Sequence, residues 1–146
     1  MIFEQIFDVK SSTYTYIISS GKGREGLIID PVIENTDIYL KFMNSMDLKL
    51  VKVIDTHIHA DHITGLNELH KRTNCLKIMG ENSKSEVIDL RVKENDKINI
   101  ENLELKTIYT PGHTDCSYSF LLNDKIFTGD TLLINGTGRT DFQNGD

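Results

Sequence analysis

Cysteine is scarce in this sequence, since Cys75 and Cys116 are the only two among 146 residues. Two thiols are too few for a disulfide framework, and they are typical of a protein in a reducing compartment. The first ten residues include Glu4 and Asp8, so they lack the basic and then apolar order of a secretory signal. We therefore expect a cytoplasmic protein with two ordinary thiols.

Clusters of positive charge and long apolar runs are also missing. The formal net charge is -6 and no run is rich in Lys or Arg, which argues against binding to the phosphate backbone of a nucleic acid. No apolar stretch approaches the roughly 20 residues needed to span a bilayer. The sequence therefore predicts partners other than nucleic acids and membranes.

Neither a linker rich in Pro, Gly or Ser nor an internal repeat divides the chain. A length of 146 residues with 38% hydrophobic residues suits one compact domain with a buried core. We expect residues 1–146 to form that domain, and the sequence leaves the oligomeric state open, a homodimer included. The last ten residues have loop composition and no closing element follows, so we expect an incomplete C-terminal end.

Short runs of β-branched and aromatic residues predict strands separated by turns. The predicted strands are Ile2–Val9, Thr13–Ser19, Leu27–Ile29, Leu50–Ile54, Leu76–Met79, Leu103–Tyr109, Tyr118–Leu122 and Lys125–Phe127. Apolar side chains at helical spacing predict an amphipathic helix over Tyr39–Met46, capped by residues 35–37, and a second short helix over Ile63–Lys71. Together these elements predict an α/β fold with mixed sheets, opened by an antiparallel meander.

The five histidines are distributed unevenly along the chain. His57, His59 and His62 follow directly on a predicted strand, His113 follows another strand through a Pro-Gly pair, and Asp130 follows a third strand. Side chains two positions apart on an extended chain point to the same side, so the first two histidines can face one point. Imidazole and carboxylate groups are good ligands for zinc and iron. A metal site where three loops converge is the economical interpretation, and unrelated surface or core histidines are the alternative.

Several other reactive residue types have simpler explanations. His70 stands apart from the cluster and is predicted to be an ordinary helix residue. Cys116 lacks a neighbouring signature of cysteine catalysis, so we expect it to be structural. Arg139 and Asp141 are expected to pair with each other or to brace the loop around Asp130, with direct substrate contact as the alternative.

Three segments resemble the metallo-β-lactamase superfamily: residues 56–62 (Thr-His-Ile-His-Ala-Asp-His), 110–114 (Thr-Pro-Gly-His-Thr) and 128–130 (Thr-Gly-Asp). The order of these segments and their separations along the chain also match those of the superfamily. The longer sequence around these motifs, together with residues 138–143 (Gly-Arg-Thr-Asp-Phe-Gln), resembles that of persulfide dioxygenases. The resemblance spans essentially the whole chain. It implies a metallo-β-lactamase αββα sandwich, of which this chain carries the N-terminal portion.

The resemblance also implies a metal centre and a reaction. One Fe(II) ion per chain would be held by His57, His113 and Asp130, with zinc as the alternative metal; this ligand set leaves other iron positions open, which suits dioxygen chemistry. Three further positions match residues that bind metal in two-zinc relatives, and they imply support around the iron here: His59, Asp61 and His62. The implied reaction converts glutathione persulfide, dioxygen and water to glutathione and sulfite, with no catalytic residue apart from the metal ligands.

Two alternatives stay open at this point. The first is a glyoxalase II-like thioester hydrolase with two metal ions. The sequence resemblance to persulfide dioxygenases counts against it, as does the lack of a later histidine to complete a second metal site. It would use six ligands: His57, His59, Asp61, His62, His113 and Asp130. The second is an inactive, shortened chain with a binding role or none, since family members continue beyond the position of Gly145. Cys116 also stands where relatives usually carry Gly or Asp.

Overall fold

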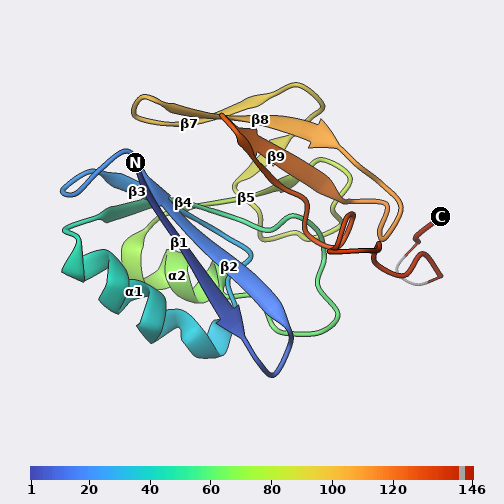
Figure 1. Ribbon diagram of the computed structural model, residues 1–146, viewed down its shortest axis with the longest axis horizontal. Helices are drawn as coiled ribbons and strands as arrows, with labels where there is room; N and C mark the ends of the chain where they lie inside the picture. The colour runs from blue at the N-terminus through green and yellow to red at the C-terminus, as the bar shows by residue number, and fades with distance from the viewer. Residues whose placement is uncertain (142–143) are drawn as a thin grey trace.

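The computed structural model describes residues 1–141 and 144–146, and within them ten strands form two sheets (Figure 1). The larger sheet has six strands, which are β1 (Ile2–Asp8), β2 (Thr13–Ser19), β3 (Glu25–Ile29), β4 (Lys49–Ile54), β5 (Leu76–Gly80) and β6 (Leu90–Val92). The smaller sheet has four, which are β7 (Lys97–Ile100), β8 (Leu103–Tyr109), β9 (Tyr118–Leu122) and β10 (Lys125–Phe127). The helices are the 3-10 turn η1 (Ile33–Asn35), α1 (Thr36–Ser45) and α2 (Leu66–Thr73).

The six-stranded sheet is mixed and follows chain order from β1 to β6. Strands β1, β2 and β3 form the predicted antiparallel meander, whereas β3, β4, β5 and β6 are parallel neighbours. Helix α1 crosses from β3 to β4 and α2 from β4 to β5, as parallel pairs require. Both helices cover the same face (Figure 1), where Tyr39 and Met43 of α1 and Leu66 and Leu69 of α2 are buried around Val53.

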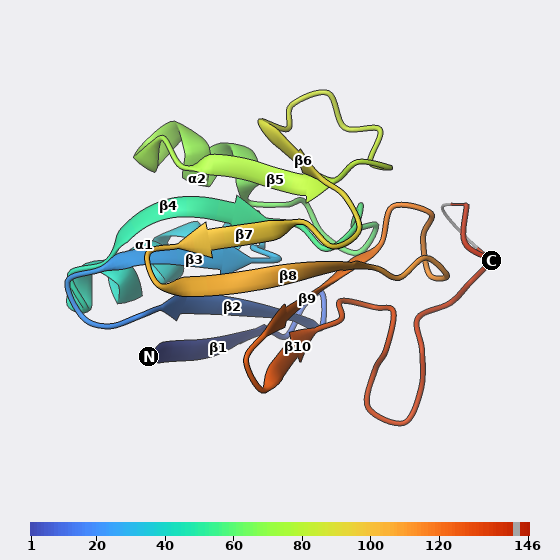
Figure 2. The same cartoon turned by 90° about the horizontal axis from the view of Figure 1, so that it is seen from above.

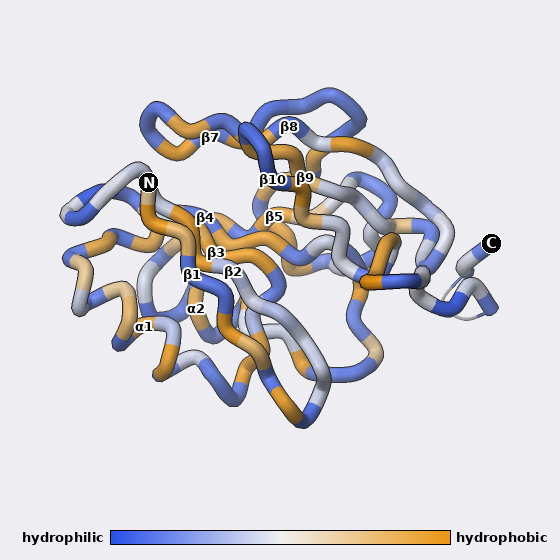
Figure 3. Tube along the Cα trace, viewed as in Figure 1, coloured by the Kyte–Doolittle hydropathy of each residue, from blue (hydrophilic) through white to orange (hydrophobic). Residues whose placement is uncertain are grey.

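The opposite face of this sheet packs on the four-stranded antiparallel sheet, whose order is β10-β9-β8-β7 (Figure 2). Ile18, Ile54 and Ile78 meet Tyr118 and Phe120 in this second core. Apolar positions concentrate along the strands and hydrophilic ones in the turns (Figure 3). Among the described residues no helix covers the outer face of the smaller sheet. The predicted α/β class is therefore confirmed, with one helical layer and both sheets of the expected sandwich.

Two predictions of local structure are wrong, and both errors arise near helix starts. Helix α2 begins at Leu66, not Ile63, because Thr64 forms a β-bridge with Val32 and holds the chain extended before the helix. The capping predicted at residues 35–37 is also absent, since Asn35 makes no side-chain cap. Its amide instead donates to a carboxylate of β1, and the turn η1 precedes the helix.

Strands β6 and β7 were not predicted from the sequence. They contain three and four residues, and charged or polar side chains such as Arg91, Lys97 and Asn99 interrupt them. An apolar signal that short cannot be separated from loop sequence. No helix in the described part of the chain is long and apolar enough to cross a bilayer.

Candidate metal centre

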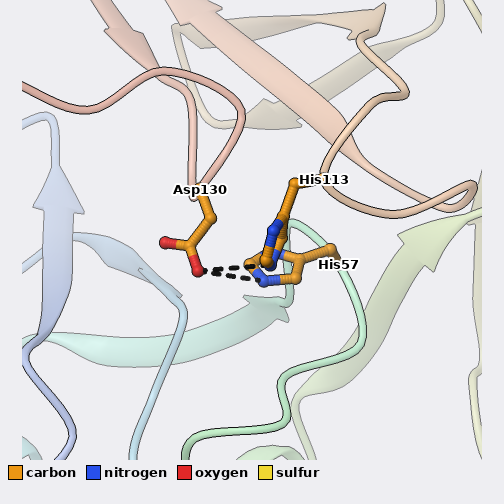
Figure 4. Close-up of side chains that lie close together, drawn as sticks. All are labelled: His57, His113 and Asp130. Carbon is orange, nitrogen blue, oxygen red and sulfur yellow. Dashed lines mark ion pairs between the residues drawn. The ribbon is translucent and has the colours of Figure 1, made fainter. Parts of the chain in front are cut away.

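The loops that follow β4, β8 and β10 bring together His57, His113 and Asp130 (Figure 4). Asp130 Oδ2 lies 3.3 Å from His113 Nε2 and 3.7 Å from His57 Nε2. Metal–ligand bonds of about 2.0–2.2 Å place ligand atoms roughly 3.0–3.6 Å from one another. The two spacings lie within or just above this range, so a single ion fits between the three side chains that the family resemblance implied.

The hydrogen bond that each imidazole makes through Nδ1 determines which nitrogen faces the space between the three side chains. His113 Nδ1 lies 2.8 Å from the carbonyl oxygen of Arg139, which can only accept, so Nδ1 carries the hydrogen. The Thr56 hydroxyl donates its hydrogen to Asp30 at 2.9 Å and therefore accepts from His57 Nδ1, also at 2.9 Å. Both Nε2 atoms consequently present lone pairs to the space between the three side chains, which is the arrangement a cation requires.

Burial prepares His57 for metal binding. Its side chain is 2% exposed, and its Nε2 has no hydrogen-bond partner among the described residues. Burial, reinforced by the charge of His59, lowers the pKa of His57 to about 3, so the ring is neutral at pH 7. An unpaired buried polar atom is unfavourable. Bonding to a divalent metal would satisfy this atom, and imidazole with carboxylate is a suitable donor set.

His59, Asp61 and His62 form a second group beside the first. His59 Nδ1 lies 3.8 Å from Asp61 Oδ1, and His62 Nδ1 lies 3.2 Å from Asp61 Oδ2. The Thr13 hydroxyl on β2 donates to the same Oδ2 at 3.0 Å, and His62 Nε2 is buried without a partner in the described structure. The ring centroids of His57 and His59 are 4.2 Å apart, so the two groups of side chains are adjacent. The second group could hold a second ion or surround an ion in the first.

A buried carboxylate beneath these loops orients both groups. Asp30, just after β3, accepts hydrogen bonds from the Thr56 amide at 2.7 Å and pairs with His59 Nε2 at 3.0 Å. Burial alone would raise the pKa of Asp30, but the charge of His59 and these donors hold it below its ordinary value. Burial opposes a charge on His59 too, yet Asp30 raises the pKa of that ring to about 9. Asp30 thus fixes His59 directly and His57 through Thr56.

Asp30, Asp55 and Thr13 were not among the site residues predicted from the sequence. Asp30 had a usable signal, because a carboxylate ends the apolar run of β3, as His57 follows that of β4. Its φ of +53° lies in the left-handed region, which Asp tolerates better than most residues. Thr13 had no signal, since its contact with Asp61 joins positions 48 apart in the chain.

Other expectations can be compared with the structure directly. Arg139 and Asp141 pair as predicted, with Nε–Oδ1 and Nη2–Oδ2 distances of 2.7 and 3.1 Å. His70 lies on α2, where its Nδ1 is 2.7 Å from the carbonyl oxygen of Cys75. Residues 142 and 143, the end of the last family-like segment, lie outside the described residues.

This fold and this site define an α/β sandwich with a candidate metal centre, and comparison with known proteins gives its family. A model of the metallo-beta-lactamase superfamily matches residues 9–97. The chain belongs to that superfamily. It is 40% identical over 148 residues to the persulfide dioxygenase ETHE1 of Mus musculus, covering 99% of this chain. It is 31% identical over 139 residues to a hydroxyacylglutathione hydrolase of Dictyostelium discoideum, covering 90% of this chain.

A solved structure is also similar along the full length. The crystal structure of ETHE1 from Myxococcus xanthus superposes with a TM-score of 0.97 at 46% identity, covering 100% of this chain and 64% of that one. The chain spans 58% of the length of the mouse protein and 52% of the Dictyostelium protein. The mouse protein is named as mitochondrial. A cytoplasmic location for this chain therefore stays a prediction.

Gly138 leaves no room for a side chain beside the candidate metal ligands Asp130 and His113. A Cβ there would lie 2.4 Å from the carbonyl oxygen of Asp130 and 2.6 Å from His113 Nδ1. Gly138→Ala should therefore displace both ligands and weaken metal binding by roughly 10–100-fold, the usual effect of disturbing groups that orient ligands. Competition with a chelator measures this affinity. Gly136→Ala is the matched control, because a Cβ there meets nothing within 4 Å; equal affinities for the two variants would contradict the prediction.

Asp55 makes the stability of the metal-free chain depend on pH. Burial, with the charge of Asp30, raises the pKa of Asp55 from 3.8 to about 7, although His59 opposes the shift. The folded chain therefore binds this proton more tightly than the unfolded chain. The resulting stabilisation is complete below about pH 3.8 and is lost as the pH rises to about 7. Asp55→Asn cannot ionise, so its free energy of unfolding should gain about 2–3 kcal/mol over the unmodified chain between pH 5 and pH 8.

Urea unfolding at several pH values, with a chelator present, measures this difference. The exposed Asp47 supplies the control variant Asp47→Asn, whose unfolding curve should follow the unmodified chain at every pH. Parallel pH profiles for Asp55→Asn and the unmodified chain would show that the Asp55 carboxyl ionises normally.

Proposed function

We propose that this chain is an iron-dependent persulfide dioxygenase, with His57, His113 and Asp130 holding one Fe(II) ion. The observation that carries the proposal is the arrangement of two imidazole Nε2 atoms and one carboxylate from three separate loops. Two histidines and one carboxylate with open positions are typical of non-haem iron oxygenases. The similarity to the mouse persulfide dioxygenase and to the Myxococcus structure supports the same reaction.

The reaction consumes glutathione persulfide, dioxygen and water and yields glutathione and sulfite. The terminal sulfur is oxidised, its bond to the glutathione sulfur breaks, and dioxygen is reduced. When bound, Fe(II) supplies open positions and the redox chemistry that dioxygen requires. The protein therefore needs no separate nucleophile.

The residues of the chain prepare the site and keep it accessible. Hydrogen bonds from the Nδ1 atoms of His57 and His113 fix both rings with Nε2 inward. The side chain of Asp130 is 43% exposed, so the site opens to solvent on that side and a thiol arm can approach it. Asp61 and His59 place further charge and hydrogen-bonding capacity beside the proposed iron site.

A two-metal thioester hydrolase is the second candidate. The second group, His59, Asp61 and His62, adjoins the first and favours it, as does the similarity to the Dictyostelium hydrolase. Such an enzyme would load both groups and use a metal-activated water as nucleophile. Metal stoichiometry therefore separates the two candidates.

The first experiment is elemental analysis after anaerobic purification, combined with oxygen uptake in the presence of glutathione persulfide. About one iron per chain with persulfide-dependent oxygen uptake is expected. Two zinc ions per chain with hydrolysis of a glutathione thioester would favour the hydrolase. Iron without oxygen uptake would support the ligand assignment but contradict dioxygenase activity of this chain, leaving a binding role or none.

A further inference from the structure

The loop after β8 is tied to the loop after β4 at two points. The Tyr118 amide donates to the carbonyl oxygen of Thr56 at 2.9 Å, and the Ile58 amide donates to Cys116 Sγ at 3.3 Å. Thr56 and Ile58 are the residues directly before and after His57. Both peptide units that flank this histidine are therefore held by one short segment, residues 116–118.

Cys116 extends this connection to the other histidine. Its side chain is buried, and its Sγ lies 3.3 Å from the hydroxyl of Thr114, the residue that follows His113. Thr114 Oγ1 lies 2.6 Å from Ser117 Oγ, which anchors the hydroxyl in turn. A continuous path of hydrogen bonds thus joins the neighbour of one candidate ligand to the neighbour of the other.

We propose that Cys116 is a positioning residue, whose sulfur accepts the Ile58 amide hydrogen and thereby fixes His57 relative to His113. The inference rests on the proposed function in one respect, that these two histidines bind a metal ion. The hydrogen bond from the Tyr118 amide to Thr56 uses backbone atoms, so no substitution removes it. The hydrogen bond from the Ile58 amide to Cys116 depends on a side chain. Neither oxidation nor ionisation of the thiol is needed.

Removal of the sulfur should affect the metal site more than the fold. Sulfur is a weak acceptor, but the Ile58 amide has no other partner within the described part of the chain. Without it, the segment between His57 and His59 is held on one side only. Groups that orient metal ligands typically contribute 10–100-fold to affinity, and we expect about a tenfold loss here.

The test compares Cys116→Ala, Cys116→Ser and Cys75→Ala in the full chain. Cys75 is a matched control because it is equally buried, at 1% exposure, but lies in the core beneath the helices. Three quantities are measured: Co(II) affinity by anaerobic titration against a chelator, the hydrogen-exchange rate of the Ile58 amide without metal, and the midpoint of urea unfolding.

Cys116→Ala should bind Co(II) about tenfold more weakly and exchange the Ile58 amide faster. Cys116→Ser keeps an acceptor and should recover both properties. Cys75→Ala should lower the unfolding midpoint while leaving Co(II) affinity and Ile58 exchange unchanged. Unchanged affinity and exchange in Cys116→Ala would overturn the inference and leave Cys116 as a space-filling residue.

The outcome is separable from that of the proposed function. Co(II) binding with the expected order of variants, but no persulfide-dependent oxygen uptake, would contradict the dioxygenase and support the role of Cys116. If the unmodified chain bound no Co(II), the hydrogen-exchange rate of the Ile58 amide would test whether Cys116 holds this peptide. Faster exchange in Cys116→Ala that Cys116→Ser reverses would support the tie, and unchanged exchange would overturn it.

Discussion

Asp130→Ala should lose metal binding while the metal-free chain remains nearly as stable as before. Metal sites with four protein ligands contribute roughly 10–16 kcal/mol, or about 2.5–4 kcal/mol per ligand, so removal of one lowers affinity by about 10²–10³-fold. The fold depends little on this carboxylate, because its side chain is 43% exposed and burial raises its pKa, which means that the folded chain disfavours its charge.

Metal titration and urea unfolding of the metal-free chain test the two halves of this prediction. Asp141→Ala is the control, since Asp141 is an exposed carboxylate of the same C-terminal loop and pairs with Arg139. It should leave metal affinity unchanged. An Asp130→Ala chain that still binds one metal ion with full affinity would show that the ion is held elsewhere, and His59, Asp61 and His62 form the adjoining candidate group.

The elements predicted correctly from the sequence are those whose burial pattern is local. Strands β2, β4, β8 and β9 carry β-branched or aromatic residues with buried positions that repeat along the strand, and their bounds agree with prediction to within a residue. Strands β6 and β7 owe their existence to neighbours: β6 pairs with β5, and β7 pairs with β8. Pairing of that kind is a tertiary effect that a short polar segment does not reveal.

The candidate site likewise contains residues that the sequence predicted and a partner that only the tertiary structure reveals. Residue type and position after strand ends predicted a metal site where three loops converge, and the family resemblance implied His57, His113 and Asp130 as its ligands. The pattern also suggested that His57 and His59 face one point, but the structure turns His59 Nε2 toward Asp30 at 3.0 Å. That partner lies 29 positions earlier in the chain. Only the parallel pairing of β3 with β4 brings the two together.

Asp30→Asn should weaken both the fold and the metal site, in contrast to Asp130→Ala. Removing one partner of a buried ion pair leaves the other charge uncompensated, with a typical loss of about 3–5 kcal/mol in the free energy of unfolding. Asn adopts a φ of +53° as readily as Asp, so the change reports on charge and not on backbone strain. Because Asp30 also orients Thr56 and His59, metal affinity should fall by roughly 10–100-fold as well.

The pH dependence of this loss identifies its cause. Asp30 raises the pKa of His59 from 6.5 to about 9, and the pKa of Asp30 is itself held below 3.8, so the pair stabilises the fold fully between about pH 3.8 and pH 6.5 and loses that contribution as the pH rises through 9. The difference between Asp30→Asn and the unmodified chain, measured by urea unfolding without metal, should therefore shrink over this range. Asp55→Asn changes a carboxyl 3.9 Å from the same ring with the opposite expected sign. A loss for Asp30→Asn that is constant with pH would mean that a neutral hydrogen bond, not an ion pair, supports the ligand loop.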